Sequence, residues 1–314
     1  MITEPVSNEL ISIENGAGIC RVTCGWKKKD LPLEVVRRYW RDVHSPSIAR
    51  RAGIYDYRHF QYDPVVSDLF APVDGITFAC PADEQLMWTS DVRYRDDAAL
   101  ALFGQSPPRD VLPGILGDID LIVDQSTTYK ALGLNARTFK DATGIATPQG
   151  TPAQPSYQIF FRQKGDEASF FAALTAMVAA WSHDPAVLRA RLSLFEVPDM
   201  EAERKAGYPV KTHPIERQYQ AWIDLVVAAP AAARDLLTVA PDLAAHVHTI
   251  HAYPTTTLCT FNYAGKPTLA GLRGFPAWHA MNGLRGFHQA QPEILEWMYG
   301  DVANGVTLHG EDAA

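Results

Sequence analysis

The order of strand-like and helix-like segments in the first half of this chain constrains its fold more than any single motif does. Residues 18–26, GICRVTCGW, alternate between apolar and polar side chains, which is typical of a half-buried strand. Apolar residues then recur at helical spacing from Leu33 to Val43, after a proline that suits a first helical turn. The segments that follow predict two strands, a second helix and a fourth strand, at residues 54–63, 84–94, 96–104 and 119–129. The order β-α-β-β-α-β is that of a ferredoxin-like unit.

The second half of the chain repeats this order after a linker. Residues 143–156, TGIATPQGTPAQPS, are rich in turn-forming residues, which indicates a connection between two folded parts. The segments that follow predict strand, helix, strand, strand, helix and strand, at residues 156–164, 166–185, 191–197, 215–228, 229–247 and 255–265. We therefore predict an α+β chain of two ferredoxin-like (βαββαβ) units. Residues 1–145 form the first, and residues 146–314 form a divergent second with a C-terminal loop or helix.

Each predicted four-stranded sheet carries its helices on one face and leaves the other face bare. Two such units in one chain can bury these bare faces by packing sheet to sheet. We therefore predict a barrel-like pseudo-dimer, and the interior between its sheets is the natural place for an apolar ligand.

Charge and composition exclude several classes of protein. The net charge is −8, whereas a nucleic-acid-binding protein needs a basic face. No stretch approaches the roughly 20 apolar residues of a membrane span, and the acidic, polar N-terminal residues do not form a signal peptide. Cys20 and Cys24 share one face of a strand, and the absence of a CxxC pair indicates buried thiols rather than a disulfide or zinc framework. We expect a cytoplasmic protein that acts on a small molecule and could pair as a homodimer.

One stretch of the first half resembles a known family. Residues 27–63, KKKDLPLEVVRRYWRDVHSPSIARRAGIYDYRHFQYD, resemble the EthD-like proteins of the dimeric α+β barrel superfamily. The W…HxP pattern of that family is matched by Trp40, His44 and Pro46. The preceding Phe of the family is replaced by Val36 or Tyr39. The resemblance covers residues 19–129 and is weak over the second half. It implies a dimeric α+β barrel fold, but the superfamily includes cofactor-free monooxygenases, polyketide cyclases, decarboxylases and haem enzymes, so it does not fix the reaction.

His44 is the residue of the first half best suited to acid–base chemistry. Pro46 disfavours helical geometry at Ser45, so we expect the first helix to end near His44. A helix C-terminus favours the protonated imidazole by roughly 0.3–1 kcal/mol, and histidine suits a general acid or base. Asp42, two residues earlier on the helix, should not face His44. The alternative is that His44 only caps the last carbonyl groups of its helix; the resemblance supports the catalytic interpretation.

One face of the strand expected after this helix offers further site residues. Its alternation places together Tyr55, Tyr57 and His59. Asp56 and Arg58 lie on the opposite face, so only one set can point into a given cavity. Aromatic rings suit a flat phenolic or polyketide-like substrate, and their polar atoms can orient it. We predict that His59 and Tyr57 act with His44 as catalytic residues, by orienting the substrate and stabilising developing negative charge. Simple packing under a helix is the alternative.

Other aromatic and basic residues could bind the substrate. We predict this role for Tyr39, Trp40, Tyr55, Trp88, Lys266 and Arg273. The aromatic residues would line the cavity, with core packing as the alternative. The two basic residues belong to the glycine-rich segment GKPTLAGLRGFP, which we expect to form a loop over the barrel mouth. There they could pair with a carboxylate or phenolate, or remain solvated.

Three histidines lie close together in the second half, namely His246, His248 and His251. Neither strand nor helix geometry gathers all three, and no carboxylate lies nearby, so we predict no metal site. A haem would need one axial histidine, for which the options are His213, His248 and His251.

These observations lead to four functional hypotheses. The preferred one is an enzyme without metal or cofactor that performs proton-transfer chemistry on a small aromatic or polyketide-like substrate. The reaction would be a decarboxylation, dehydration, cyclisation or related lyase step. The alternatives are a cofactor-independent monooxygenase acting on a phenol, a non-catalytic small-molecule-binding accessory protein, and a haem enzyme.

Overall fold

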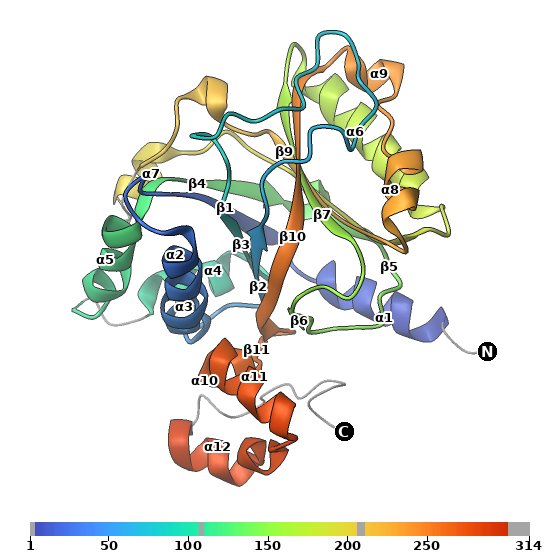
Figure 1. The fold of residues 1–314 in the computed structure, drawn as a ribbon. Helices are drawn as coiled ribbons and strands as arrows, with labels where there is room; N and C mark the ends of the chain where they lie inside the picture. Colours follow the sequence, from blue (N-terminus) through green and yellow to red (C-terminus); the bar gives the residue numbers. More distant parts are fainter. Residues whose placement is uncertain (1–3, 107–109, 206–210, 301–314) are drawn as a thin grey trace.

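The computed structural model describes residues 4–106, 110–205 and 211–300. Its fold is mixed α+β, with a curled antiparallel sheet that runs through both halves of the chain and most of its helices on the outer side of that sheet (Figure 1). The first half comprises α1 (Glu4–Glu14), β1 (Ile19–Lys27), α2 (Leu33–Tyr39), a π-helical turn (Trp40–His44), α3 (Ser45–Ala49), β2 (Asp56–Tyr62), β3 (Trp88–Tyr94), α4 (Asp97–Gln105), α5 (Leu112–Ile122), β4 (Val123–Leu132) and β5 (Ala136–Asp141).

The second half begins with the short strand β6, and its C-terminal helices lie beyond the last long strand (Figure 1). Its elements are β6 (Gln149–Gly150), β7 (Ser156–Gln163), α6 (Glu167–Ser182), β8 (Val187–Leu194), α7 (Met200–Lys205), a 3₁₀ turn (Ile215–Arg217), β9 (Ala221–Val227), α8 (Pro230–Leu236), α9 (Pro241–Ala244), β10 (Val247–Tyr263), β11 (Lys266–Pro267), α10 (Leu269–Arg273), α11 (Phe275–Leu284), a 3₁₀ turn (Phe287–Ala290) and α12 (Pro292–Tyr299). Among the described residues, no helix has the length and apolar character needed to cross a membrane.

The strand order is the same in both halves of the sheet. It runs β4-β1-β3-β2 in the first half and β10-β7-β9-β8 in the second. The 17-residue strand β10 joins the halves, because its N-terminal part pairs with β7 and its C-terminal part pairs with β2. The two edge strands are β4 and β5, and only a 3₁₀ turn at Gly133–Asn135 separates them in the chain. The sheet must therefore curl until its edges approach one another, which gives it a concave and a convex face.

Several expected elements differ from the structure, beginning with the fourth strand of the first half. The fourth strand was expected to begin at residue 119, but residues up to Ile122 continue helix α5. Leu116 and Ile122 are both buried from this helix, so helical packing of the apolar run outweighs its strand-like composition. The glycine-rich segment expected as a loop forms β11, α10 and the start of α11. A side chain at Gly271 would lie 2.1 Å from the carbonyl oxygen of Phe261, so glycine lets α10 pack directly on β10.

The first helical segment does not end at His44, contrary to expectation. A π-helical turn links α2 to α3, and the N–H of Ser45 donates to the carbonyl of Trp40, five residues earlier. Pro46 has no N–H, and in a regular α-helix its ring would clash with the carbonyl of Asp42. The wider π turn lets the helix continue past the proline, and such turns are frequent at functional sites. His44 therefore lies inside a continuous helical segment, where the expected effect of a helix C-terminus does not act.

The middle of the concave face, expected to hold an apolar ligand, is filled by side chains. An apolar cluster there includes Val22, Trp26, Phe60, Phe160, Trp222 and Tyr253. As expected, Cys20 and Cys24 share this face as buried free thiols. Buried ion pairs also cross the interior, as where Arg191 lies 2.9 Å from Asp91. The filled middle of the concave face therefore leaves no room for a substrate at that place.

Candidate functional site

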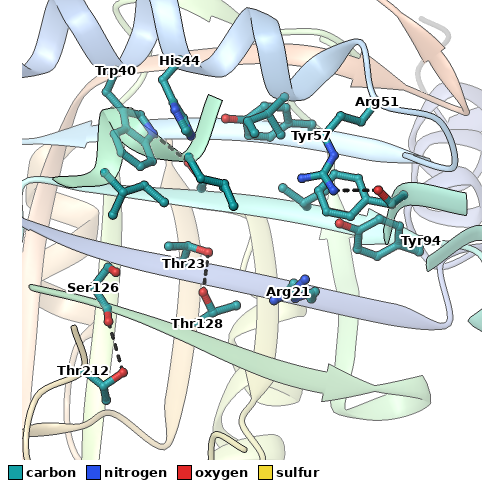
Figure 2. A pocket seen from close by; sticks show the side chains of 16 residues that line it. Arg21, Thr23, Trp40, His44, Arg51, Tyr57, Tyr94, Ser126, Thr128 and Thr212 are labelled. Atoms are coloured by element: carbon teal, nitrogen blue, oxygen red, sulfur yellow. Dashed lines mark hydrogen bonds between the residues drawn. The ribbon is translucent and has the colours of Figure 1, made fainter. Parts of the chain in front are cut away.

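A cavity of about 110 Å³ lies between the convex face of the first half and the helices that cover it (Figure 2). Strands β1 to β4 form its floor, with side chains that include Arg21, Thr23, Tyr57, Ser90, Tyr94 and Thr128. The helices form its roof, with side chains that include Trp40, His44, Ile48, Phe103 and Leu116. Strand alternation explains the polar floor, because Arg21 and Thr23 point to the opposite face from the buried cysteines of β1. We refer to this space as the first cavity.

The imidazole of His44 is buried in the roof of the first cavity and is held by two neighbours. Its ring stacks on the indole of Trp40, with the ring centroids 4.1 Å apart. Its Nδ1 lies 3.4 Å from Oδ2 of Asp118, which belongs to helix α5. A carboxylate at Nδ1 selects the tautomer with the proton on that nitrogen, so Nε2 is the nitrogen that can accept a proton. Trp40 and His44, two of the residues that match the W…HxP pattern, therefore line the same cavity.

Asp118 is the carboxylate that orients His44, and sequence reasoning missed it. The hydrogen bond with His44, followed by one from Tyr39, lowers the pKa of Asp118, although burial partly opposes them. The hydroxyl of Tyr39 donates to Oδ1 of Asp118 at 2.5 Å, and this bond raises the pKa of Tyr39 to about 12. Asp42, which lies closer in sequence, instead pairs with Arg41 at 2.6 Å. Asp118 is therefore an ionised partner that can stabilise a protonated His44.

His59 lies behind the cavity wall rather than in it. Burial lowers the pKa of His59 to about 3, so its ring is neutral near neutral pH. Its Nε2 lies 3.2 Å from the amide nitrogen of Gln61, which donates to it, and its Nδ1 lies 3.4 Å from Oγ of Ser90. The indole N–H of Trp40 also donates to Ser90, at 3.2 Å. His59 thus supports Ser90 and Trp40, and through Trp40 the ring on which His44 stacks.

Tyr57 and two arginines give the cavity its remaining polar groups. The hydroxyl of Tyr57 donates to Ser45 at 2.8 Å, and burial raises the pKa of Tyr57 to about 12, so the phenol stays neutral. The guanidinium of Arg51 lies 3.4 Å from the ring centroid of Phe103 and donates to the carbonyl of Phe103 at 2.7 Å. Arg21 approaches from the floor (Figure 2). The described lining contains two arginines and no carboxylate, so the cavity favours a substrate with negative charge.

The other predicted substrate-binding residues do not line the first cavity. The ring of Trp88 packs under Trp40 with centroids 4.8 Å apart. The guanidinium of Arg95 lies over the ring of Tyr55, 4.8 Å from the ring centroid. Lys266 is exposed on β11, and Arg273 on α10 donates to the carbonyl of Gln289 at 3.2 Å. The C-terminal segment therefore brings its basic residues to a different part of the molecule.

The histidines of the second half are engaged in separate contacts. His251 is buried, its Nδ1 lies 2.7 Å from the hydroxyl of Tyr219, and burial lowers its pKa to about 3. The Nδ1 of His248 lies 2.8 Å from the hydroxyl of Thr249. Across residues 4–106, 110–205 and 211–300, no three His, Cys, Asp or Glu side chains are arranged to hold a metal ion. His213 packs edge-on against Trp26, with ring centroids 4.3 Å apart.

No family model matches the chain, and no curated protein matches its sequence. Among solved structures, it is similar to a protein of Lactobacillus acidophilus described as a "putative monooxygenase", at 12% identity and a TM-score of 0.40, over 78% of this chain and 97% of that one. A Fusobacterium nucleatum protein of the same description matches at 9% identity and a TM-score of 0.44, over 80% of this chain and 97% of that one. An "anthrone oxidase-like protein" matches at 9% identity and a TM-score of 0.42, over 78% of this chain and 93% of that one. Similarity this distant assigns no activity to this chain.

Proposed function

We propose that the chain is an enzyme that removes a proton from a small aromatic or polyketide-like substrate without a redox cofactor, with His44 as the general base. The observation that carries the proposal is the pair of His44 and Asp118 at a buried cavity lined by arginine. Histidine is the side chain most often used for general acid–base catalysis. A carboxylate on one ring nitrogen prepares the other nitrogen for proton transfer.

The proposed step begins when Nε2 of His44 takes a proton from an O–H or activated C–H of the substrate. Asp118 and the face of Trp40 then stabilise the imidazolium that forms. The electron pair left on the substrate is delocalised onto an oxygen, which Arg21 and Arg51 stabilise. His44 returns the proton to another atom of the substrate or to its leaving group. Decarboxylation, dehydration and cyclisation can each be completed in this way.

The size of the first cavity supports a small reacting group. Its volume is about 110 Å³, and an engineered cavity of about 150 Å³ in another protein holds benzene. A single ring or a carboxylate-bearing fragment therefore fits with slight expansion. A larger substrate would keep its remaining rings outside, beyond Ser126 and Thr212 at the edge of the cavity (Figure 2).

The test is turnover of a panel of phenolic and polyketide-like carboxylic acids, followed by mass spectrometry of the products. We expect a product that forms with the native chain and almost disappears with His44→Ala, both in air and without oxygen. Product that requires oxygen and consumes it would replace the proposal with a monooxygenase that begins with the same deprotonation. Binding without turnover, unchanged in His44→Ala, would indicate an accessory protein. A Soret band in the visible spectrum of the purified protein would indicate a haem enzyme.

We also propose that the chain is a fusion of two ferredoxin-like units, with residues 1–145 and 146–314 as the two domains, which form a pseudo-dimer of the dimeric α+β barrel type. The identical strand order of the two halves supports this description. The continuous sheet through β10, and the pairing of β5 with β8, support close association of the units. Four free cysteines support a reducing, cytoplasmic location.

A further inference from the structure

A second cavity, of about 700 Å³, lies at the end of the concave face that helix α1 covers. Its walls come from α1, from the segment 143–154 and from the ends of β2, β7, β8, β9 and β10. Tyr57 lines the first cavity and Arg58 lines this one, and the two are neighbours on β2 whose side chains point to opposite faces. Strand β2 therefore separates the two cavities. The volume falls within the roughly 300–1,000 Å³ usual for small-molecule sites.

Apart from the exposed Glu9, the charged side chains that line the second cavity are held in ion pairs. Arg58 lies 2.6 Å from Oε1 of Glu14, and Arg189 lies 2.8 Å from the same oxygen and 2.7 Å from Asp224. All four side chains are almost fully buried. A charged ligand would either break these pairs or bury its own charge without a partner, and both are costly. The electrostatics of the wall therefore favour an uncharged ligand.

The rest of the wall is mainly apolar, and it also contains a buried acceptor, Oε1 of Gln149. The apolar side chains include Leu10, Ile13, Ala146, Val226, Leu258 and Trp278. Gln149 also lines the cavity, and its amide nitrogen donates to the carbonyl of Thr260 at 2.6 Å. Its Oε1 is buried and accepts no hydrogen bond from the described part of the chain. An unsatisfied acceptor in a ligand-sized cavity is the place where a ligand O–H or N–H would bind.

We propose that the second cavity is a ligand site separate from the His44 site, and that it takes an uncharged, mainly apolar ring compound that donates one hydrogen bond to Oε1 of Gln149. The pairing of Arg58 and Arg189 with carboxylates gives selectivity against anions. The first cavity, by contrast, favours anions, so the two sites prefer different compounds.

The test is isothermal titration calorimetry of the full chain with 2-naphthol and with 2-naphthoate at pH 7. The two probes share a ring system, but only 2-naphthol is uncharged and carries a hydroxyl donor. We expect 2-naphthol to bind and to lose at least tenfold in affinity in Ala146→Trp, whose indole would project into the second cavity and leave the first unchanged. Failure of 2-naphthol to bind the native chain, or equal affinity in Ala146→Trp, would overturn the proposal. Ala153→Trp, on the same segment, serves if circular dichroism shows that Ala146→Trp is not folded.

The hydrogen bond is tested separately with Gln149→Met, which keeps the length of the side chain and removes the acceptor. We expect roughly a tenfold loss of 2-naphthol affinity, as for one buried hydrogen bond. Gln154→Met, on the same wall, is the matched control and should bind as the native chain does. Equal affinity in Gln149→Met and Gln154→Met would refute the role of Gln149. The Ala146→Trp variant should also leave 2-naphthoate binding unchanged, and a parallel loss would refute the separation of the two sites.

Discussion

The convex faces of the two halves share one strand order but differ in character. In the first half the convex face carries polar side chains such as Arg21, Thr23 and Ser90, and a cavity lies above them. In the second half the strands instead present apolar side chains to α6, among them Phe161, Leu192, Ile223, Leu225 and Ile250. Topology is therefore not what makes a site in this molecule. The half whose convex strand positions are polar has a cavity beneath its helices, and the half whose convex positions are apolar is filled.

The first half also helps to fill the second. The segment between β2 and β3 contributes Leu69 and Phe70 to the apolar cluster under α6. The ring of Phe70 stacks on Phe78, with centroids 5.6 Å apart. The corresponding layer of the first half is covered instead by Trp40 and His44 from the π-helical turn. We therefore expect substitutions in the layer that contains Trp40 and His44 to lower catalysis most. Substitutions in the apolar cluster under α6 should lower stability most.

The largest effect should come from replacing His44. We expect His44→Ala to lower kcat by roughly 10²- to 10⁴-fold, because it removes the general base. The exposed His183, which directly follows helix α6 in the second half, is the matched control, and His183→Ala should leave kcat unchanged. Steady-state kinetics on a substrate from the proposed panel measures both. Equal losses of kcat in His44→Ala and His183→Ala would contradict the proposal that catalysis depends on the first half alone.

The next effect concerns stability and uses a matched pair of leucines. Leu174 is fully buried in the filled layer of the second half, whereas Leu116 borders the first cavity. Leu→Ala substitutions in protein cores cost roughly 2–5 kcal/mol. We expect the loss of unfolding free energy to lie near the upper end of this range for Leu174→Ala. For Leu116→Ala it should lie near or below the lower end, because a side chain beside a cavity has fewer contacts to lose. Urea denaturation gives both values, and a larger cost at Leu116 would contradict the contrast.

Residues of one strand show how far the sequence could predict this contrast. Alternation correctly placed Tyr57 and Arg58 on opposite faces of β2, because a strand has a period of two whatever packs on it. Alternation does not reveal which face is hollow, since that depends on side chains from other segments. The sequence predicted a ligand between the sheets; side chains fill the middle of that space, and a cavity of about 700 Å³ remains at the end that α1 covers. The four strands expected in each half were predictable because each segment carries its own periodicity.

Asp118 and Arg51 show what the sequence did not reveal. The run around Asp118, LPGILGDIDLI, fits a strand or a helix, and only the burial of Leu116 and Ile122 decides for the helix. Reading the run as a helix would have brought the carboxylate into consideration as a partner for His44. Arg51 follows α3 and reaches the cavity because it binds the end of α4. That contact joins segments about 50 residues apart, and no local pattern encodes it.

A smaller effect is expected from Asp118→Asn, which keeps the shape of the side chain and removes its charge. We expect kcat to fall by roughly 10- to 100-fold with little change in KM, as for other residues that orient a catalytic group. Asp120→Asn is the control, since Asp120 lies on the same helix but pairs with Lys211 at 2.8 Å. An unchanged kcat in Asp118→Asn would leave Asp118 with a structural role only.

The smallest effect tests a property that both halves share. His59 in the first half and His251 in the second are buried, and burial lowers the pKa of each to about 3. Between about pH 6.5 and 3 the unfolded chain therefore binds a proton at each histidine that the folded chain does not bind, so stability falls as the pH falls. Each histidine contributes a slope of about 1.4 kcal/mol per pH unit over this window.

Replacement of either histidine should flatten this dependence by one proton. We expect His59→Gln and His251→Gln to reduce the slope of unfolding free energy against pH by similar amounts between pH 6 and 4, as measured by urea denaturation. The double variant should lose both contributions, because the two sites lie in different halves and share no contact in the described structure. A flattened slope in only one variant would mean that the halves differ in the hydration of their buried histidines as well as in their convex faces. Equal reductions of the slope in His59→Gln and His251→Gln would mean that the two halves differ only in the layer that contains His44.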